Sequence, residues 1–282
     1  MSLRPWLSGF RARIQKSQKV RRSGRSSVRA VQTVQPLEER TLLTATALVL
    51  GTDLTVLTDA DESISVGVNT TTGNAEVQID GTVLASGSTV AAGSLTSLTI
   101  QSGAGTNQID LSGISASVFT SLTSISVIAG DGDDTIIAAS DVASSISGDD
   151  GDDVITGSSA ADTLMGNDGN DTIDGGAGND DINAGDGDDS VTAGTGDDTV
   201  VGDDGNDVVF GGAGNDSVVA NNGADSLFGE AGDDTLNGDG GFDSIDGGSG
   251  DDVVLAGADR DTVSGGSGND TLNGQAGNDS VL

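Results

Sequence analysis

The sequence predicts an all-β fold in which short parallel strands stack as the coils of a solenoid. Three observations predict it: a nine-residue unit repeats from residue 148 to 282 without an insertion, one place in the unit is always aliphatic, and glycines recur between these places. The stretch GNDGNDTIDGGAGNDDIN shows the register, because Asp171 and Asp180 are nine residues apart and each precedes an isoleucine by two residues. A random polar stretch has no reason to keep this spacing, which is typical of a repeat architecture.

Fifteen consecutive units follow this register, and each has aspartate at its sixth position. The aspartates are Asp153, Asp162, Asp171, Asp180, Asp189, Asp198, Asp207, Asp216, Asp225, Asp234, Asp243, Asp252, Asp261, Asp270 and Asp279. The eighth position is always aliphatic: Ile155, Leu164, Ile173, Ile182, Val191, Val200, Val209, Val218, Leu227, Leu236, Ile245, Val254, Val263, Leu272 and Val281. The fourth position is glycine in thirteen units, with Ala160 and Asp259 as the exceptions, and the first is always glycine or alanine.

Each aliphatic residue lies in a short segment such as DTIDG, in which outward and inward positions alternate. This pattern predicts a three-residue strand with one buried side chain. The other residues of the unit form a turn, in which glycines permit positive φ and let carbonyl groups point inward. One such strand buries almost nothing alone, so the units must stack. Two nine-residue units then complete one coil, and turns on the same side are 18 residues apart.

Stacking places the aspartates in two columns. The first column contains Asp153, Asp171, Asp189, Asp207, Asp225, Asp243, Asp261 and Asp279, and the second contains Asp162, Asp180, Asp198, Asp216, Asp234, Asp252 and Asp270. Neighbouring strands are about 4.8 Å apart, so each column is a line of like charges unless a cation lies between successive coils. Calcium fits best, because it takes about six to eight oxygen ligands, carboxylate or carbonyl, in flexible geometry, whereas magnesium is smaller and stricter. One ion between successive aspartates gives seven sites in the first column and six in the second, or 13 calcium ions.

Charge is segregated along the chain, whose net charge is −34. Residues 1–40 hold ten of the eleven basic residues and two acidic ones, a charge of +8, whereas residues 148–282 hold 32 acidic residues and Arg260, a charge of −31. Such a composition is typical of a disordered chain, and we expect disorder of the repeats without calcium. Thirteen calcium ions would add +26 and bring the repeats close to neutrality.

Composition also limits the chemistry. The chain has no cysteine and no histidine, which excludes Ser-His-Asp and Cys-His nucleophilic catalysis and the usual zinc ligand sets. Carboxylates are so abundant that no single pair is distinguished as an acid and base couple. We therefore expect that the protein is not an enzyme.

Two segments precede the repeats. Residues 1–40 are basic and lack apolar periodicity, which predicts a disordered tail or a sorting segment; the acidic repeats argue against a nucleic-acid partner. The apolar run TLLTATALVL that follows is too short to span a bilayer. Residues 41–147 alternate in LTVLTD, SISVGVN, AEVQID, TSLTIQ and TSISVIA, which predicts short strands that form a strand-rich cap.

Two pieces of this second segment are degenerate copies of the later unit. SGAGTNQID, residues 102–110, has Asn107 at the sixth position, and AGDGDDTII, residues 129–137, has Asp134 there. Asp134 precedes Asp153 by 19 residues instead of 18, so the register slips once. The cap is therefore expected to lead directly into the repeats.

The unit, as in GGAGNDSVV and GGSGNDTLN, resembles the GGxGxDxUx nonapeptide of RTX (repeat-in-toxin) proteins. This resemblance implies a parallel β-roll, a solenoid similar to a right-handed β-helix, with secretion from a Gram-negative cell. It also implies calcium held by the sixth-position aspartates and by turn carbonyls. The turn glycines implied as ligands are Gly169, Gly178, Gly187, Gly196, Gly205 and Gly214. Near the N-terminus, PLEERTLLT resembles the LExRxLL signature of planctomycete surface proteins, which implies sorting toward the cell surface.

Two function classes follow. The first is a calcium-dependent structural or adhesive protein of the cell surface or exterior, which folds where calcium is abundant and contacts other surface components. The second is the repeat region of a toxin or exoenzyme whose active domain is absent. The frequent Ser and Thr at the seventh position are expected to form a solvated strand face, with an ice-binding or glycan-binding ladder as the alternative. The sequence ends at GNDSVL without the tail that RTX proteins use for type I secretion, so we expect another export route or a fragment.

Overall fold

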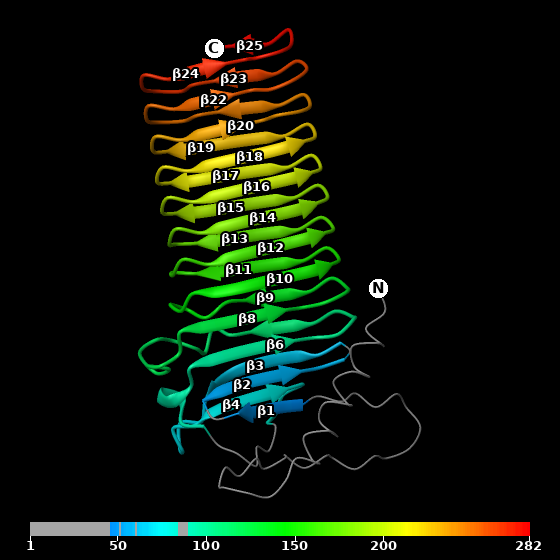
Figure 1. The fold of residues 1–282 in the computed structure, drawn as a ribbon, viewed down its shortest axis with the longest axis vertical. Helices are drawn as coiled ribbons and strands as arrows, with labels where there is room; N and C mark the ends of the chain where they lie inside the picture. Colours follow the sequence, from blue (N-terminus) through cyan, green and yellow to red (C-terminus); the bar gives the residue numbers. More distant parts are fainter. Residues whose placement is uncertain (1–45, 51, 60, 84–89) are drawn as a thin grey trace, which may run out of the picture. The chain divides into compact units, whose positions relative to one another are not determined.

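The computed structural model describes residues 46–50, 52–59, 61–83 and 90–282. These residues form two sheets that share one stack of coils, and the chain passes from one sheet to the other at every turn of the repeats (Figure 1). The 1–40 tail and the PLEERTLLT signature lie outside the described residues. No α-helix occurs in the described part, which has only a short 3-10 helix, η1, at Ala92–Ser94. The predicted all-β parallel solenoid is confirmed.

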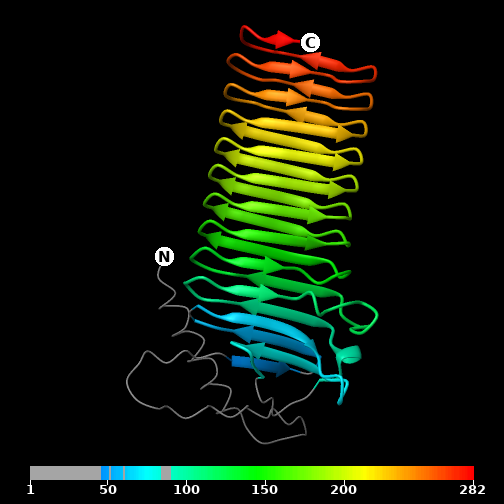
Figure 2. The same cartoon turned by 180° about the vertical axis from the view of Figure 1, so that it is seen from behind.

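The sheets contain 12 and 13 strands. The 12-stranded sheet is formed by β1 (Thr46–Leu50), β2 (Asp53–Leu57), β6 (Ser97–Gln101), β8 (Ser124–Ile128), β10 (Ser144–Asp150), β12 (Thr163–Asp168), β14 (Asp181–Asp186), β16 (Thr199–Asp204), β18 (Ser217–Asn222), β20 (Thr235–Asn237), β22 (Val253–Leu255) and β24 (Thr271–Asn273). The 13-stranded sheet is formed by β5 (Thr82–Val83), β4 (Ala75–Ile79), β3 (Ser63–Val68), β7 (Gln108–Asp110), β9 (Thr135–Ile137), β11 (Val154–Ser158), β13 (Thr172–Gly176), β15 (Ser190–Thr195), β17 (Val208–Ala213), β19 (Ser226–Ala231), β21 (Ser244–Asp246), β23 (Thr262–Ser264) and β25 (Ser280–Val281). Figure 2 shows the same stack from behind.

The pairing register confirms that two units form one coil. Ile155 pairs with Ile173, and Ile173 pairs with Val191, each 18 residues further along in the parallel ladder. The degenerate copies join the same ladder, because Ile109 pairs with Ile136 and Ile136 pairs with Ile155. The single slip of register is therefore absorbed between β9 and β11 without breaking the sheet.

The strands differ in length along the stack. From β20 to β24 they have three residues, as predicted, whereas β10 to β19 mostly have five or six. The difference arises because pairing resumes at positions 2 and 3 of the next unit, as in the pairs Asp203 with Asn221 and Asp204 with Asn222. In the C-terminal coils only isolated bridges, such as Gly240 with Ala258, remain at these positions.

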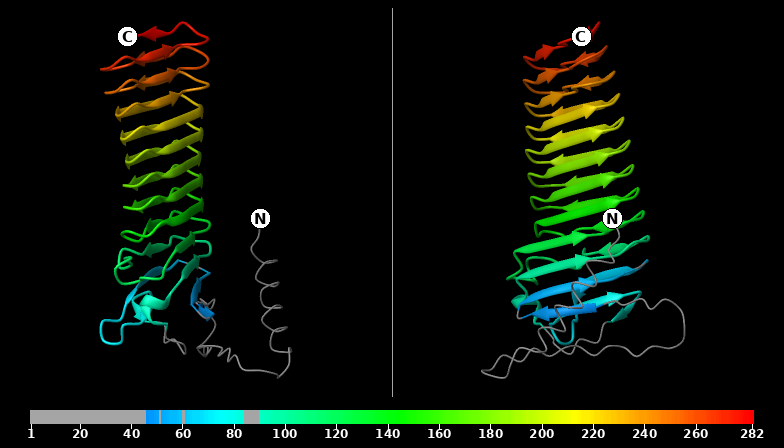
Figure 3. Two further views of the ribbon diagram at one scale, coloured as in Figure 1. Left: turned by 60° about the vertical axis from the view of Figure 1, so that its left-hand side comes forward. Right: turned by 45° about the vertical axis from the view of Figure 1, so that its right-hand side comes forward.

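Between the two sheets lies a narrow apolar core. The position-8 aliphatic side chains from Ile155 to Val263 are buried, and so are the alanines that occupy position 1, such as Ala193 and Ala256. Figure 3 shows the two sheets facing each other across this core, coil upon coil. Each strand of the repeats thus contributes one large aliphatic side chain, and the space beside it admits only glycine or alanine.

The N-terminal coils have a richer core and covered edges. The five predicted strands are present as β2, β3, β4, β6 and β8, and each buries two apolar residues, for example Leu98 and Ile100 in β6. Strand β1 pairs antiparallel with β2, and β3, β4 and β5 pair antiparallel in turn. Antiparallel strands at the first coil cover edges that would otherwise be free to pair with another chain.

Two turn positions have positive φ but accept different residues. At position 2, φ is positive in every unit except that of Ser158, for example 84° at Asn167 and 74° at Asp203, a region in which Asn and Asp are tolerated. At position 4, φ is larger, 144° at Gly187 and 140° at Gly214, and this region is essentially restricted to glycine. The backbone therefore explains why position 4 is almost always glycine while position 2 varies.

Candidate metal centre

The predicted aspartates form two columns along the turns of the stack. Those of the first column directly precede strands of the 13-stranded sheet, and those of the second precede strands of the 12-stranded sheet. Thirteen of them, from Asp153 to Asp261 without Asp270 and Asp279, are at most 2% exposed. Asp134 is buried in the same way and extends the first column by one coil. The structure thus brings together every predicted aspartate with its neighbour one coil away.

One carboxylate oxygen of each aspartate belongs to a regular ladder. The backbone N–H of Asp171 donates to Asp189 Oδ1 at 2.7 Å, and that of Asp180 donates to Asp198 Oδ1 at 2.8 Å. The same bond crosses the register slip, because the N–H of Asp134 donates to Asp153 Oδ1 at 2.7 Å. Each Oδ1 therefore has one donor, the main chain of the preceding coil.

The other carboxylate oxygen of most column members has no hydrogen-bond donor. Thirteen buried Oδ2 atoms are in this state: those of Asp134, Asp153, Asp171, Asp180, Asp189, Asp198, Asp207, Asp216, Asp225, Asp234, Asp243, Asp252 and Asp261. An oxygen that is buried without a donor costs free energy, and an unpaired buried charge costs more. A series of such atoms at the same place in successive coils is the arrangement expected of a cation-binding site.

Main-chain oxygens converge on the unpartnered atoms. A Cβ placed on Gly247 would stand 2.5 Å from Asp252 Oδ2 and 2.7 Å from the carbonyl oxygen of Gly265, one coil further. A Cβ on Gly211 would similarly meet Asp216 Oδ2 at 2.6 Å and the carbonyl oxygen of Gly229 at 3.0 Å. Position 1 thus opens onto a small space shared by a carboxylate oxygen and a carbonyl oxygen. Carboxylate and carbonyl oxygens are the donor set that calcium prefers.

Burial changes the acidity of the columns. Desolvation raises the pKa of Asp153, Asp180 and Asp189 to about 7. It raises the pKa of Asp134, Asp171, Asp216, Asp225 and Asp243 to about 6. The pKa of Asp162, Asp198, Asp207, Asp234 and Asp252 is also raised, again chiefly by desolvation. Without a cation, these carboxyls are therefore driven toward the neutral form.

The second column begins differently from its later members. Asp162 Oδ2 accepts a hydrogen bond from the backbone N–H of Ser158 at 2.8 Å. Asp162 lies in the unit in which Ala160 replaces the position-4 glycine. At the other departure, Asp259 takes the position-4 place with φ of 78° and lies just before the exposed Arg260. Both departures from the glycine rule occur in units that still keep their column aspartate.

The position-4 glycines that were predicted as ligands lie in the same turns and are half-buried. A Cβ on Gly187 would collide with the carbonyl oxygen of Gly169, and one on Gly214 with that of Gly196. Their carbonyls therefore point along the stack toward the next coil, and their role as ligands stays a prediction. No cluster of three or more acidic side chains that could hold a metal ion occurs in the described part of the chain. A cation in the columns must therefore take main-chain oxygens.

Sequence reasoning missed the carbonyl oxygens of position 1 as candidate ligands. The signal was present, because position 1 is glycine or alanine in every unit. It could not be interpreted without knowing that residues five apart in one unit, such as Gly211 and Asp216, meet in the turn. Asp134 was recognised only as part of a degenerate copy, although its burial and its unpartnered Oδ2 match those of the repeats.

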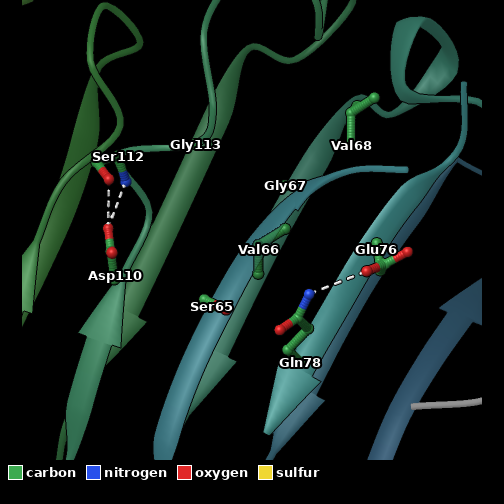
Figure 4. Close-up of a pocket in the computed structure, with 9 residues that line it drawn as sticks. All are labelled: Ser65, Val66, Gly67, Val68, Glu76, Gln78, Asp110, Ser112 and Gly113. Carbon is green, nitrogen blue, oxygen red and sulfur yellow. Dashed lines mark hydrogen bonds between the residues drawn. The ribbon is translucent and has the colours of Figure 1, made fainter. Parts of the chain in front are cut away.

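A shallow pocket lies apart from the columns, on the outer side of β3 and β4 (Figure 4). Its two carboxylates have donors: Gln78 Nε2 donates to Glu76 Oε1 at 3.0 Å, and Ser112 donates to Asp110 Oδ1 through its N–H at 2.9 Å and its hydroxyl at 2.6 Å. Both carboxylates therefore already accept hydrogen bonds from neighbouring residues of the chain. The columns, with their unpartnered oxygens, are the stronger candidate site.

A parallel solenoid with buried carboxylate columns in its turns defines a metal-binding repeat protein. The family model of the RTX calcium-binding nonapeptide repeat matches residues 126–141, 147–182, 156–191, 183–218, 210–245 and 246–281. These segments cover more than half of the chain, which belongs to this family of calcium-binding repeats. No curated protein matches the chain. In the described residues, no helix is long and apolar enough to cross a membrane.

Proposed function

We propose that the two aspartate columns bind calcium between successive coils and that the repeats fold when calcium binds. The observation that carries this proposal is the series of 13 buried Oδ2 atoms without a donor. These atoms border the same space as main-chain carbonyl oxygens, because a Cβ on Gly247 would meet both Asp252 Oδ2 and the carbonyl oxygen of Gly265. Oxygens packed against oxygens are stable only if a cation or a proton lies among them.

The ligands that support this proposal come from two successive coils. Aspartate Oδ2 and the position-1 carbonyl of the next coil border the same space, and the position-4 carbonyl of the turn is the further ligand of the proposal. Bound calcium would supply the positive charge that this oxygen set lacks. One ion between successive aspartates gives the 13 sites expected from the sequence, and the pair of Asp134 and Asp153 adds one more. A hydrogen bond fixes the position of each carboxylate, because the N–H of the preceding aspartate in the column donates to its Oδ1, as Asp207 does to Asp225.

Coupling between calcium and folding rests on the small core of the repeats. A strand such as β13 buries one large side chain, Ile173, and a fully buried side chain of this kind contributes about 1.5 to 3 kcal/mol. Ordering a nine-residue unit costs backbone entropy of about 1 to 2 kcal/mol per residue. The column carboxylates add a desolvation cost. Calcium that binds the folded coils and not the unfolded chain shifts this balance toward folding.

We propose that the protein lies outside the cell or on the cell surface. Its proposed role there is structural or adhesive. Calcium sites of extracellular type have dissociation constants of about 0.1 to 1 mM, so folding of this kind is suited to an environment rich in calcium. From β1 to β25 the described chain consists of stacked coils and their turns, which supports a structural role over a catalytic one. Labelling of intact cells with an antibody to the roll tests the location; a signal seen only after lysis would contradict it.

Circular dichroism of the full chain with calcium, with magnesium and with a chelator tests calcium-coupled folding. We expect a strong β signal with calcium at about 10 mM, its loss in chelator, and little recovery with magnesium, because magnesium requires stricter octahedral geometry. Isothermal titration calorimetry gives the stoichiometry. Identical spectra in calcium and chelator would overturn the coupling, and an absence of calcium binding in calorimetry would overturn the site.

A further inference from the structure

The aspartates of both columns stop, on the N-terminal side, at a residue whose side chain donates hydrogen bonds, which an aspartate carboxylate cannot do. The first ladder continues past this residue to the buried Glu62, whose N–H donates to Asn107 Oδ1 at 3.2 Å. In the first column, Asn107 precedes Asp134, and in the second, Ser144 precedes Asp162. Asn107 and Ser144 hold the same main-chain place as the aspartates: their N–H groups donate to Asp134 Oδ1 at 2.6 Å and to Asp162 Oδ1 at 2.7 Å. Only the side chain differs.

The amide of Asn107 occupies the place of the unpartnered Oδ2. Its Nδ2 donates to the carbonyl of Gly105 at 3.0 Å, to that of Gly103 at 3.2 Å and to that of Ala129 at 3.4 Å. These are the carbonyls of positions 4 and 2 of its own unit and of position 1 of the next coil. The amide orientation follows from this network, because the reverse orientation would set an oxygen against three oxygens. A side-chain N–H group thus satisfies carbonyls that include the position-1 carbonyl of the next coil, which in later coils borders the same space as Oδ2.

Ser144 does the same in the second column. Its hydroxyl donates to the carbonyl of Val142 at 3.1 Å, which is position 4 of its own unit. Ser144 is 4% exposed and Asn107 is fully buried, so neither donor is available to solvent. A side-chain donor that bonds to turn carbonyls therefore occurs in both columns, as an amide in one and a hydroxyl in the other.

On the N-terminal side of Ser144, the column becomes apolar. Its place is taken by Ile125, Leu98 and Leu54 in successive coils of the same ladder, and all three are buried. The family match also begins at residue 126, after Asn107, and omits residues 142–146, which include Ser144. Packing in the second ladder therefore changes at Ser144, where the family match is also interrupted.

We propose that Asn107 and Ser144 are side-chain substitutes for the metal ion, and that the coils on their N-terminal side stay folded without calcium as a base for the repeats. This inference rests on the proposed calcium function of the columns. The base has what the repeats lack: strands β2, β3, β6 and β8 each bury two apolar residues, and Phe119 and Leu95 fill the space beside them. Coils that bind calcium then fold onto an edge that the base already provides. The free-energy cost of forming a first coil from the unfolded chain is therefore avoided.

Hydrogen exchange of the full chain measured by mass spectrometry separates the base from the repeats. In chelator, we expect amides of β2, β3, β6 and β8 to stay protected while those of β13 to β23 exchange freely, and calcium to protect both. If β2 to β8 exchange as fast as the repeats in chelator while calcium still binds, this inference falls and the proposed function stands. A chain that binds no calcium would overturn both.

Asn107→Asp tests the substitute directly. It removes the two N–H donors that the three carbonyls share and puts a carboxylate oxygen in their place, so exchange of the base in chelator should accelerate about tenfold or more. With calcium, protection should return and native mass spectrometry should show one additional bound ion. Gln108→Asp is the matched control, because it adds the same charge to the next residue, whose side chain is exposed; it should change neither quantity.

Ser144→Asp repeats the test in the second column. We expect one more calcium ion than in the wild type and faster exchange around β8 and β10 in chelator. This variant keeps the proposal testable if Asn107→Asp fails to fold. Variants that fold, bind no additional calcium and keep wild-type protection in chelator would overturn the substitute role.

Discussion

The backbone N–H of Asp207 donates to Asp225 Oδ1 at 2.8 Å, 18 residues further along the chain, while Asp225 Oδ2 has no donor. Each aspartate therefore has two tasks. Its Oδ1 links its own coil to the preceding one, and its Oδ2 is left for a cation. Removal of one carboxylate in mid-column consequently affects both the ladder of hydrogen bonds and the two cation sites that flank it.

We predict that Asp207→Ala weakens calcium-dependent folding more than Asp279→Ala. Asp207 is buried between two coils, whereas Asp279 lies in the last coil and is only partly buried. The loss at Asp207 includes a buried hydrogen bond, which costs about 1 to 3 kcal/mol when one partner is left unsatisfied, and two neighbouring ion sites. A calcium titration followed by circular dichroism should show a higher midpoint and a lower Hill coefficient for Asp207→Ala.

Asp207→Asn is the control for this pair. The amide can keep the oxygen that accepts the preceding N–H, and its NH₂ can donate to turn carbonyls as Asn107 does. We expect it to lose calcium ions while weakening calcium-dependent folding less than alanine does. Equal effects of Asp207→Ala and Asp279→Ala on the titration would contradict a stacked array.

Periodicity explains how much could be predicted from the sequence. The coil of two units, the strand at each position-8 aliphatic and the two aspartate columns all follow from a spacing repeated fifteen times. Cross-coil contacts did not follow from it. That Asn107 Nδ2 meets the carbonyl of Ala129, 22 residues away, depends on how the turns superpose, and a degenerate unit alone cannot show which atoms it faces.

The backbone conformation of the turns could not be predicted from the spacing of the repeats either. Position 2 has glycine in only some units, which from sequence indicates a loose requirement. The structure shows positive φ there in every unit except that of Ser158, with φ of 71° at Glu230 and 62° at Asp239. Residue identity varies because several polar residues tolerate this region. A strict backbone requirement can therefore be hidden by a permissive residue pattern.

Gly240→Ala and Gly241→Ala should have opposite outcomes although the residues are adjacent. A Cβ on Gly240 meets nothing closer than Asn222 Oδ1 at 3.5 Å, whereas Gly241 has φ of 148° and a Cβ there would collide with the carbonyl oxygen of Gly223. We expect Gly241→Ala to lower the free energy of unfolding by about 1 to 3 kcal/mol or more from backbone strain. Gly240→Ala should be neutral or stabilising by about 0.4 to 1 kcal/mol. Thermal unfolding in calcium measures both, and equal melting temperatures would contradict the positive φ of Gly241.

Phe210 and Phe228 should couple across neighbouring coils. Their rings stack on the outer face of the 13-stranded sheet, with centroids 4.9 Å apart and planes 10° from parallel. Such pairs contribute about 0.5 to 1.5 kcal/mol beyond the area they bury. A double-mutant cycle of Phe210→Ala and Phe228→Ala, measured by chemical unfolding in calcium, should give a coupling of this size. Additive effects would show that the rings stabilise their strands separately.

The calcium-free and calcium-bound chains should depend on pH in opposite directions. In the calcium-free fold, desolvation raises the pKa of Asp153 and Asp180 to about 7 and that of Asp171 and Asp216 to about 6, against an ordinary value of 3.8. The folded chain therefore holds more protons than the unfolded chain between about pH 4 and pH 7. Its free energy of unfolding is highest at about pH 4 and below, and that stability is lost as the pH rises through 6 to 7.

Calcium reverses this pH dependence of stability, because the carboxylates must lose their protons before they act as ligands. The calcium concentration at half-maximal folding should consequently fall as the pH rises from about 5 to about 7.5, with protons released on binding. Circular dichroism in metal-free buffer across this range measures the first trend, and calcium titrations at each pH measure the second. Asp207→Asn shows how far each trend depends on column carboxylates, because it removes one titrating group while keeping an oxygen for the ladder. Metal-free protein that becomes more stable as the pH rises toward 7 would contradict the buried, unpartnered state of the columns.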